Sequence, residues 1–531
     1  MQVAHKTIGQ VFHEVSKTHQ MKEALLDLGT GARYTYALLE WEVDRIARGL
    51  VGLGIGKGGN VVLWAPNVSE WIVAQLAVAS IGAVLVPLNP GADEKDLHYI
   101  LDQTGAKVII MAKGLDGEEF IEMIWVELHR LSGLEHIVVL GTDSFPDTIN
   151  WPELGSRGQE IDDEEIEKIR ANTTPEDPVA IMYTSGTTGK PKGVVVDHLG
   201  LINKSLCSME RQGLGPEDRI CLFFPLYHMF GNTCIALTGL LAGASIIIPS
   251  KEFEPYSILS AIAKEQCTAV YGSPSMFSAL IDHPQFEQKA WACVRKGIIG
   301  GAPCPAPLME RLVNELGISG LKVGYGITEA SSWVTMTRDE DPVDVRISTI
   351  GCPLPCNEVK IVDMETGQTC PPGEKGELCT RGFLMKGYYK MPGATAAAID
   401  PEGWFHTGDL AVMDENGYVT LVGRIKEIIR RGDGTEIIPG EVEEILYLLP
   451  EVRQAQVFGF NDRDGNTRIG AFVKLKKDST LDVETIRQRL ASELSAEKVP
   501  EYIKIVDSFP TTKSGKIQKF RLAQLAAQQW G

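Results

Sequence analysis

Hydrophobic and polar residues alternate over roughly the first 350 residues in a way that predicts strands and helices in turn. Short runs rich in β-branched residues are separated by longer amphipathic stretches such as Glu40–Leu53 and Pro255–Glu265. The runs are Val61–Trp64, Val84–Leu88, Val108–Met111, His136–Leu140, Val179–Met182, Ser245–Ile248 and Thr268–Tyr271. Because strands that alternate with helices usually form parallel sheets covered by helices, we predict an α/β fold for this part.

The pattern changes twice towards the C-terminus. From about Gly351 the sequence is strand-rich with turn signals, as in Glu358–Val362, Gly376–Arg381 and Tyr418–Val422. After Arg424, short helical and strand-like segments alternate over roughly 105 residues, a normal size for a domain. These segments are Glu441–Leu449, Ala455–Phe460, Ala471–Leu475, Val483–Leu494 and Ile503–Val506. We therefore predict a strand-rich subdomain followed by a small α+β domain.

Length and composition narrow the class of protein. A chain of 531 residues is too long for one ordinary core, so more than one domain is expected. Hydrophobic residues make up 44% and charged residues 23%, as in an ordinary globular protein. The net charge of −19 argues against a nucleic-acid partner, although a local group of lysines and arginines can still hold an anion.

The ten cysteines are scattered without a CxxC pair, which favours reduced thiols. The first residues, MQVAHKTIGQ, lack the pattern of a secretory signal. The most apolar window, Trp71–Leu88, contains Gln75, Gly82 and Pro87, so we expect a buried helix turning into a strand and no integral membrane segment. The acidic stretch Ile161–Arg170 is expected to be a solvated helix or a linker. We therefore expect a cytoplasmic location or another reducing interior.

The most informative segment is YTSGTTGKPKG, Tyr183–Gly193, which follows the predicted strand Val179–Met182. It combines glycines, hydroxyl side chains and two lysines. Glycines let several backbone N–H groups converge on an anion, hydroxyls add short donors, and lysines add positive charge. It is not a Walker loop, because Lys190 is followed by Pro191 rather than by Ser or Thr. We predict a loop that binds a nucleotide triphosphate.

This loop, together with seven further motifs in the same order along the chain, resembles the adenylate-forming superfamily of acyl-CoA synthetases, aryl-CoA ligases, luciferases and peptide-synthetase adenylation domains. The resemblance covers nearly the whole chain. The further motifs are LYHMFG (Leu226–Gly231), GGAP (Gly300–Pro303), GYGITE (Gly324–Glu329), GELCTRG (Gly376–Gly382), GWFHTGDL (Gly403–Leu410), GRIKE (Gly423–Glu427) and TTKSGKI (Thr511–Ile517).

The resemblance implies a large N-terminal domain, 1–423, made of layered α/β sheets with the strand-rich subdomain from about 351. It also implies a small mobile C-terminal domain, 424–531, that turns about a hinge at 424–427. Lys426 occupies the hinge position, where one residue absorbs a large backbone change.

The implied reaction joins a carboxylic acid to the α-phosphate of ATP, releases pyrophosphate, and then transfers the acyl group to the thiol of coenzyme A. The catalytic residues that the resemblance implies are Lys516, Glu329, His228 and Thr184. Lys516 would bridge the acid and the α-phosphate, and Glu329 with Thr184 would hold Mg²⁺, a hard cation that prefers oxygen ligands.

The resemblance also implies the nucleotide contacts. Tyr325 would stack on the adenine and Asp409 would accept both ribose hydroxyls, with Arg424 as a second ribose or phosphate contact. The full set is Thr184, Ser185, Gly186, Thr187, Thr188, Gly189, Lys190, Gly301, Ala302, Pro303, Gly324, Tyr325, Gly326, Ile327, Thr328, Asp409, Arg424 and Lys516.

The acyl pocket that the resemblance implies is apolar, with His228 beside the carboxylate in a positioning or gating role. Its residues are His228, Met229, Phe230, Ser273, Phe277, Gly300 and Trp333, and Trp333 could close the pocket and limit the chain length. Arg430, Arg431 and Gly432 would contact coenzyme A. The loop Ile428–Glu441 is about one residue longer than in relatives, with Asp433 inserted.

The motifs and their spacing most resemble fatty-acid or medium-chain acyl-CoA synthetases. An aryl-acid or alicyclic-acid CoA ligase, or a ligase that uses an acyl-carrier protein, would share the first step. A catalytically inactive nucleotide-binding regulator is the alternative outside catalysis, and the presence of Glu329, Asp409, Arg424 and Lys516 together counts against it. The sequence leaves monomer and homodimer open, and it does not fix the acid.

Overall fold

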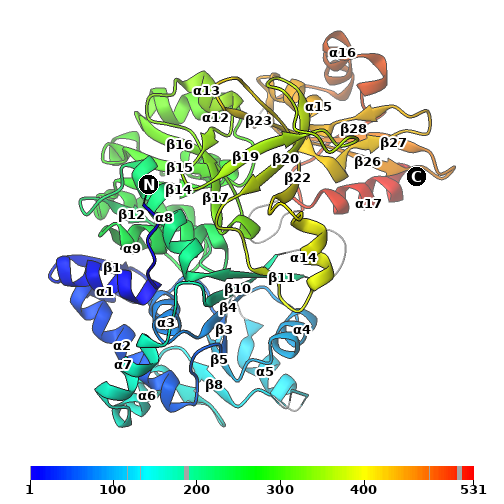
Figure 1. The fold of residues 1–531 in the computed structure, drawn as a ribbon. Helices are drawn as coiled ribbons and strands as arrows, with labels where there is room; N and C mark the ends of the chain where they lie inside the picture. The colour runs from blue at the N-terminus through cyan, green and yellow to red at the C-terminus, as the bar shows by residue number, and fades with distance from the viewer. Residues whose placement is uncertain are drawn as a thin grey trace. The chain divides into compact units, whose positions relative to one another are not determined.

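The computed structural model describes residues 2–115, 118–128, 130–131, 133–184, 191–477, 479–510 and 517–530. The chain divides into two compact units. The first comprises residues 1–346, 353–358 and 381–405, and the second comprises 347–352, 359–380 and 406–531. Figure 1 shows the helices and strands along the chain, and the two units are described separately below.

The first unit contains two large sheets. The eight-stranded sheet has the order β21-β11-β10-β4-β3-β5-β8-β9. Its strands are β21 (Gly387–Tyr388), β11 (Lys192–Asp197), β10 (Pro178–Thr184), β4 (Val84–Leu88), β3 (Asn60–Trp64), β5 (Val108–Met111), β8 (His136–Val139) and β9 (Ile149–Asn150). The strands from β10 to β9 are parallel to one another, whereas β11 runs antiparallel to both β10 and β21.

The nine-stranded sheet has the order β18-β17-β16-β15-β14-β12-β13-β1-β2. Its strands are β18 (Cys352–Pro353), β17 (Ser332–Met336), β16 (Gly320–Ile327), β15 (Lys296–Gly300), β14 (Ala269–Gly272), β12 (Arg219–Cys221), β13 (Ser245–Ile248), β1 (Glu23–Asp27) and β2 (Arg33–Thr35). A short hairpin is formed by β6 (Gly114–Leu115) and β7 (Glu118–Glu119). The predicted α/β fold with largely parallel sheets is confirmed.

Most helices of the first unit bury one apolar face, whereas the helix Ser69–Ser80 is buried almost all round. Those of the first unit are α1 (Ile8–Thr18), α2 (Tyr36–Gly52), α3 (Ser69–Ser80), α4 (Glu94–Thr104), α5 (Phe120–Leu128), α6 (Trp151–Arg157), α7 (Asp163–Ala171), α8 (His198–Gln212), α9 (Thr238–Leu241), α10 (Pro255–Lys264), α11 (Pro274–Ile281), α12 (Ala306–Glu310), α13 (Val343–Ser348, which ends in the second unit) and α14 (Pro392–Ala398). The short helical segments are η1 (Gly158–Glu160), η2 (Phe230–Leu237), η3 (Gln288–Trp291), η4 (Arg311–Glu315) and η5 (Thr328–Ala330).

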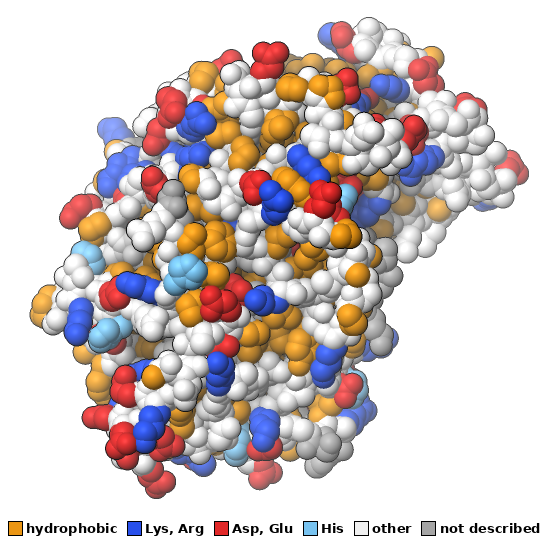
Figure 2. Space-filling model, viewed as in Figure 1, with side chains coloured by type: hydrophobic (Ala, Val, Ile, Leu, Met, Phe, Trp, Pro, Cys, Tyr) orange, Lys and Arg blue, Asp and Glu red, His pale blue; other side chains and the backbone are white. Residues whose placement is uncertain are grey.

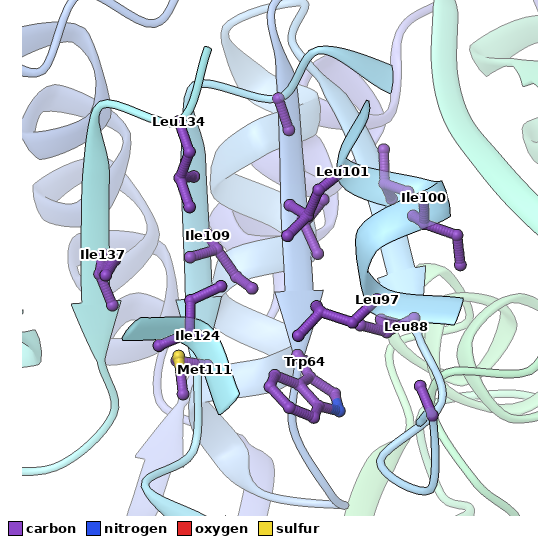
Figure 3. Close-up of a cluster of buried hydrophobic side chains, with 14 of the residues drawn as sticks. Trp64, Leu88, Leu97, Ile100, Leu101, Ile109, Met111, Ile124, Leu134 and Ile137 are labelled. Carbon is purple, nitrogen blue, oxygen red and sulfur yellow. The ribbon is translucent and has the colours of Figure 1, made fainter. Parts of the chain in front are cut away.

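The core of the eight-stranded sheet shows how the apolar pattern produces this layering. Ile100 and Leu101 on α4 and Ile124 on α5 pack on Trp64 and Ile109 of the strands (Figure 3). Trp64 also stacks on Phe120 with ring centroids 4.0 Å apart. Fully burying such side chains contributes about 1.5–3 kcal/mol each, so this cluster is a main source of the unit's stability.

The apolar window Trp71–Leu88 is the buried helix α3 followed by β4, as predicted. The acidic stretch Ile161–Arg170 contains most of α7, of which only Ile166 is buried, so it is the predicted solvated helix. Among the described residues, every helix is too short or too polar to cross a lipid bilayer. All ten cysteines are free thiols.

The second unit contains a four-stranded sheet and the C-terminal part of the chain. The sheet has the order β19-β20-β22-β23, and its strands are β19 (Glu358–Val362), β20 (Lys375–Arg381), β22 (Phe405–Met413) and β23 (Val419–Arg424). The remaining elements are η6 (Ile425–Glu427), β24 (Ile429–Arg430), β25 (Glu436–Ile437), α15 (Pro439–Tyr447), β26 (Val452–Asn461), β27 (Thr467–Leu475), α16 (Val483–Glu493), η7 (Ala496–Lys498), β28 (Tyr502–Ile505) and α17 (Lys519–Trp530).

Two contacts join the sheet of the second unit to its C-terminal part. Leu410 on β22 packs with Ile428 and Ile438, and Lys375 lies 3.1 Å from a carboxylate oxygen of Glu441. The strand-rich sheet and the C-terminal segment therefore belong to the same compact unit. The domain boundary at 423 and 424 stays a prediction. On the face shown in Figure 2, lysines and arginines lie among aspartates and glutamates.

Candidate functional site

Four neighbouring parallel strands of the nine-stranded sheet end at one edge, and a predicted site residue stands at each end. Strands β12, β14, β15 and β16 lie side by side in parallel. His228 comes after β12, Ser273 after β14 and Glu329 after β16, while Gly300 is the last residue of β15. Open α/β sheets bind their ligands at the carboxyl ends of the strands. The topology therefore gathers residues from four separate motifs into one candidate site.

An aromatic cluster forms the apolar part of this site. Trp333 on β17 is only 3% exposed, and its ring meets Phe230 edge-on with centroids 5.0 Å apart. Phe230 in turn lies 4.5 Å from Phe224. A Cβ added to Gly324 would lie 2.9 Å from the Trp333 ring, and one added to Gly300 would lie 3.5 Å from it. The two glycines therefore make room for the indole.

The other predicted pocket residues are Met229, Ser273 and Phe277. Met229 and Phe277 are buried. Ser273 is the N-cap of α11, where its hydroxyl accepts a hydrogen bond from the backbone N–H of Met276 at 3.4 Å. The structure thus brings Phe230, Gly300 and Trp333 into direct proximity and places Ser273 and Phe277 at the neighbouring strand end.

His228 is exposed, and its ring lies 5.5 Å from that of Phe224. Its Nδ1 accepts a hydrogen bond from the backbone N–H of Phe230 at 3.1 Å. An accepting nitrogen carries no proton, so the neutral ring carries its proton on Nε2. The imidazole is therefore set up as a donor, which suits a residue that positions a carboxylate.

Two buried asparagines hold the segment around His228. Asn67 donates to the backbone oxygen of Phe224 at 3.0 Å and accepts from the backbone N–H of Leu226 at 2.8 Å. Asn232 donates to the oxygen of Leu226 at 3.0 Å from within η2, a π-helical segment. Such segments are rare and are frequently found at functional sites. Sequence reasoning missed both asparagines, because an isolated Asn carries no motif signal.

Glu329 has a partner that the sequence did not reveal. The hydroxyl of Tyr388 donates to Glu329 Oε1 at 2.9 Å, and the cation of Lys192 lies 4.8 Å from the centre of the Tyr388 ring. Burial, followed by the nearby charge of Glu329, raises the pKa of Tyr388, so its hydroxyl stays protonated and remains a donor. The second carboxylate oxygen of Glu329 would remain for a cation.

The backbone beyond Glu329 is strained. Ser331 has φ +57° and Ser332 has φ +126°, and both side chains are buried. Non-glycine residues rarely adopt such values, and the strain persists only where the surroundings fix it, often at functional sites. This turn fixes Glu329 and Trp333 at either end of one short segment.

The strands on either side of the glycine-rich loop form an antiparallel pair. Thr184 at the end of β10 is paired with Lys192 at the start of β11, and its hydroxyl donates to the Lys192 oxygen at 3.4 Å. Lys192 in turn lies over Tyr388, the partner of Glu329, so the base of the loop and the predicted metal ligand share one edge. The other predicted loop residues, Ser185, Gly186, Thr187, Thr188, Gly189 and Lys190, lie outside the described residues.

The predicted adenine contacts lie at the ends of β15 and β16. Gly301, Ala302 and Pro303 are exposed, whereas Tyr325 is buried. Gly326 faces β17 so closely that a Cβ there would lie 2.5 Å from the oxygen of Ser332. Ile327 and Thr328 are half-buried and lead directly to Glu329.

In the second unit the two predicted ribose contacts pair with each other. Asp409 on β22 stands opposite Arg424 on β23, and Arg424 Nε lies 2.7 Å from Asp409 Oδ1. Asp409 is buried, and its backbone N–H donates to the Thr407 hydroxyl at 3.0 Å. The ion pair fixes the carboxylate, and an arginine with five N–H groups can hold it while still binding another anion.

The segment after Arg424 contains the predicted hinge and the coenzyme A contacts. Lys426 is exposed in η6. Arg430 lies 2.7 Å from Glu436 across the hairpin of β24 and β25, and Arg431 lies 2.6 Å from Glu501. Gly432 is exposed in the loop between the two strands. Both arginines are thus held by carboxylates, and their role towards coenzyme A stays a prediction.

The loop predicted to be longer than in relatives forms a local turn. Asp433 accepts a hydrogen bond from the N–H of Thr435 at 2.9 Å, and Gly434 adopts φ +87°. An aspartate that bonds its own backbone two residues on, followed by a glycine with positive φ, makes a stable turn. Lys516, the predicted catalytic lysine, lies outside the described residues.

The fold is α/β, and an aromatic cluster and several predicted site residues lie at the carboxyl ends of its parallel strands. The chain matches the family model of AMP-binding enzymes over residues 12–389 and that of the AMP-binding enzyme C-terminal domain over residues 441–516. It belongs to the AMP-binding enzyme family. The predicted membership of the adenylate-forming superfamily is thereby confirmed.

Named relatives and solved structures agree with this membership. The chain is 36% identical to YngI of Bacillus subtilis (strain 168), to which acyl-CoA synthetase activity is ascribed, over 98% of this chain and 97% of YngI. It is 34% identical to the human mitochondrial medium-chain acyl-CoA ligase ACSF2, over 98% of this chain and 87% of ACSF2. The ATP-bound structure of MatB from Rhodopseudomonas palustris superposes with a TM-score of 0.84 at 26% identity, covering 99% of this chain and all of MatB.

Proposed function

We propose that this enzyme is an ATP-dependent acyl-CoA ligase that activates a medium-chain or other fatty acid as its acyl-adenylate and then transfers the acyl group to coenzyme A. The observation that carries the proposal is the topology, which places His228 and Glu329 after parallel strands of one sheet. Glu329 is linked through Tyr388 and Lys192 to the base of the glycine-rich loop, and Trp333 packs on Phe230. Full-length similarity to acyl-CoA synthetases and medium-chain acyl-CoA ligases supports the same reaction.

The chemistry explains why these groups are needed together. A carboxylate is a poor acyl donor, and its attack on the α-phosphorus of ATP turns one of its oxygens into part of a good leaving group, AMP. Because nucleophile and phosphate are both anionic, the enzyme must align them and neutralise charge in the transition state. The donor proton on His228 Nε2 would orient the acid, and the backbone and lysine of the glycine-rich loop would hold the phosphates.

The donor set at Glu329 fits Mg²⁺. Hard divalent cations bind carboxylate and hydroxyl oxygens, keep several waters and bridge phosphates. Glu329 supplies a partly exposed carboxylate whose one oxygen is held by Tyr388, and Thr184 supplies a hydroxyl at the loop base. When bound, the cation would neutralise charge on the phosphates. Lys516 would add the charge that bridges the acid and the α-phosphate.

The remaining contacts would come from the second unit. Asp409 would accept the ribose hydroxyls with Arg424 fixing its carboxylate, and Arg430, Arg431 and Gly432 would contact coenzyme A. Lys426 would act as the hinge between the adenylation and thioester-forming arrangements of the 1–423 and 424–531 domains. The ion pairs of Arg430 and Arg431 would have to exchange for phosphate contacts.

The pocket supports an acid of limited length. The Trp333 indole fills the space over Gly300 and Gly324, which leaves less room for a long chain. Similarity to ACSF2 favours a medium-chain fatty acid over the aryl-acid, alicyclic-acid and carrier-protein alternatives. Ten free thiols are typical of a reducing compartment, and we propose a cytoplasmic enzyme acting as a monomer or a homodimer on small molecules.

The proposal is tested with the purified enzyme in two assays. ATP–pyrophosphate exchange over a panel of straight-chain, aryl and alicyclic acids reports the first step, and detection of acyl-CoA reports the second. We expect exchange to be strongest with medium-chain acids and to depend on Mg²⁺. Exchange with none of the acids would instead favour a nucleotide-binding regulator, and exchange without CoA thioester would favour a carrier-protein acceptor.

A further inference from the structure

A compact group of three different donor side chains lies in the four-stranded sheet, apart from the residues assigned to the reaction. Glu377 and Cys379 stand two positions apart on β20, so both side chains point to the same face of the strand. His406 comes from the neighbouring strand β22. One ligand atom from each residue lies within 4.8 Å of the other two.

The three side chains converge on one point rather than forming a chain. His406 Nδ1 lies 2.8 Å from Glu377 Oε2 and 3.5 Å from Cys379 Sγ, so the carboxylate and the sulfur face the same ring nitrogen. In a catalytic Cys-His-Glu triad, the thiol and the carboxylate contact different nitrogens of the histidine ring, because one nitrogen takes the thiol proton and the other donates to the carboxylate. This geometry therefore disfavours a nucleophilic triad and suits an ion at the common point.

We propose that Glu377, Cys379 and His406 form a binding site for Zn²⁺. Zinc takes sulfur, imidazole nitrogen and carboxylate oxygen together, in tetrahedral sites of three protein ligands and a water or of four protein ligands. For tetrahedral zinc the sulfur–nitrogen separation is about 3.6 Å and the nitrogen–oxygen separation about 3.4 Å. The first is already present, and the second requires the Glu377–His406 contact to open by roughly half an ångström.

The surroundings of the group also fit a metal site. The other oxygen of Glu377 accepts a hydrogen bond from the backbone N–H of Gly408 at 3.0 Å, which orients the carboxylate as outer partners orient metal ligands. The Thr407 hydroxyl donates to the oxygen of Leu378 at 2.7 Å and ties the two strands together between the ligands. Cys379 is buried, while Glu377 and His406 are half-buried, so solvent can supply a fourth ligand.

The site is distinct from the proposed magnesium site. A thiolate and an imidazole prefer zinc to magnesium, which binds oxygen ligands. The predicted ribose contacts Asp409 and Arg424 pair with each other and are not members of the group. Zinc bound by the group would therefore use none of the predicted ribose contacts.

The test uses Co²⁺ as a spectroscopic substitute for Zn²⁺ on the full-length reduced enzyme. We expect a near-ultraviolet thiolate-to-cobalt charge-transfer band and intense visible bands of tetrahedral cobalt, both removed by added Zn²⁺. Calorimetric titration with Zn²⁺ should show release of the Cys379 proton and tighter binding at higher pH, because the thiol must deprotonate.

Matched variants identify the ligands. Cys379→Ser and His406→Gln should each abolish the charge-transfer band or weaken Zn²⁺ binding at least about 10-fold, because losing a ligand costs at least as much as losing an outer partner. Cys370→Ser, at a partly exposed cysteine of the same unit, and His283→Gln should leave the spectrum unchanged.

Two outcomes would overturn the proposal. One is the absence of a cobalt–thiolate band in the wild-type enzyme, and the other is a band that persists in both Cys379→Ser and His406→Gln. Should Cys379→Ser not fold, His406→Gln alone decides, since this partly exposed side chain can be changed with less effect on packing. None of these readouts involves acyl transfer, so they are independent of the proposed function.

Discussion

Tyr388 donates to one carboxylate oxygen of Glu329, so its hydroxyl would position this predicted metal ligand and leave the other oxygen for a cation. Because its pKa is raised, the hydroxyl stays a neutral donor throughout the useful pH range. We expect Tyr388→Phe to raise the Mg²⁺ concentration needed for ATP–pyrophosphate exchange by about 10-fold, as loss of an outer partner typically does.

The control for that change is the adjacent tyrosine. Tyr389→Phe removes the hydroxyl that accepts a hydrogen bond from Asn60 at 3.3 Å and should leave the Mg²⁺ requirement near wild type. Equal Mg²⁺ curves for wild type and Tyr388→Phe would show that the contact with Glu329 has no part in holding the cation.

Trp333 offers a second prediction at the scale of one residue. Its indole occupies the space over Gly300 and Gly324, so Trp333→Ala should open the pocket to longer acids. Each extra buried methylene is worth about 0.8 kcal/mol, or roughly a fourfold gain in kcat/KM per methylene until the cavity is filled. The optimum in a panel of straight-chain acids should move to longer chains.

Removing a large buried side chain also costs stability, so thermal unfolding of the variant is measured alongside, and Trp333→Leu serves as a milder change. Trp41→Ala, at an exposed tryptophan, is the matched control and should keep the wild-type chain-length profile. An unchanged optimum in folded Trp333→Ala would place the indole outside the acyl pocket.

The sequence could reveal a site residue only where that residue stands in or directly after a short sequence motif. Glu329, His228 and Trp333 were named from short motifs, and the topology brings their strand ends together. Asn232 was missed because an isolated Asn carries no motif signal, and Tyr388 and Asn67 were missed because each acts through a contact with a segment distant in sequence. The group of Glu377, Cys379 and His406 was missed for the same reason, since its third member comes from another strand.

At the scale of elements, strands that are buried on both faces were predicted correctly, because nearly all their residues are apolar. Examples are β3, β4, β5 and β13. Strand β16 was missed because its sequence GLKVGYGI contains three glycines, which have low β-propensity, and two of these, Gly324 and Gly326, lie in its second half. Those glycines are required by tertiary packing, since Gly324 faces Trp333 and Gly326 faces Ser332. Such a requirement is set by another strand and is absent from the local pattern.

Helix α8 carries a fully buried lysine whose protonation should affect stability. Lys204 Nζ contacts Asn357 Oδ1 and donates to the oxygen of Trp333 at 3.3 Å. Burial lowers the pKa of Lys204 to about 8, from 10.5. Between these values the unfolded chain binds a proton that the folded protein does not, so the free energy of unfolding rises with pH.

We therefore expect wild type to gain stability relative to Lys204→Met as the pH is raised from about 8 to about 10, by up to about 3 kcal/mol. The measurement is the difference in Tm between the two proteins at several pH values, which cancels the titration of other groups. A difference that stays constant or shrinks over this range would mean that Lys204 keeps its proton in the folded state.

Segment η6 carries the predicted hinge, and Lys426→Pro tests it. Proline fixes φ near −65° at its own position and restricts the preceding residue, so the hinge loses one of its two backbone arrangements. We expect acyl-adenylate formation to stay within about twofold of wild type. Acyl-CoA formation should fall by roughly 100-fold, the usual loss in rate when reacting groups are no longer aligned. Lys426→Ala, which keeps the backbone free, is the control.

Single-turnover assays separate the two half-reactions of that variant. Acyl-adenylate is measured with ATP and acid alone, and thioester formation is measured with pre-formed adenylate and coenzyme A. Wild-type turnover in the complete reaction would show that residue 426 does not absorb a backbone change during catalysis.

At the scale of the whole molecule, one acid must meet two chemically different partners, a phosphate and then a thiol. Lys516 is predicted to serve only the first, because the positive charge that bridges carboxylate and α-phosphate has no role once the adenylate exists. We expect Lys516→Ala to slow ATP–pyrophosphate exchange by roughly 100-fold or more, the usual effect of losing a charged transition-state contact. Reaction of pre-formed acyl-adenylate with coenzyme A should remain within about threefold of wild type, because the lost contact belongs to the first step alone.

Lys477→Ala, at an exposed lysine of the same unit, is the control and should leave both steps unchanged. Equal losses in the two half-reactions would assign Lys516 to general binding of the acyl group or to the fold, and not to the adenylation step.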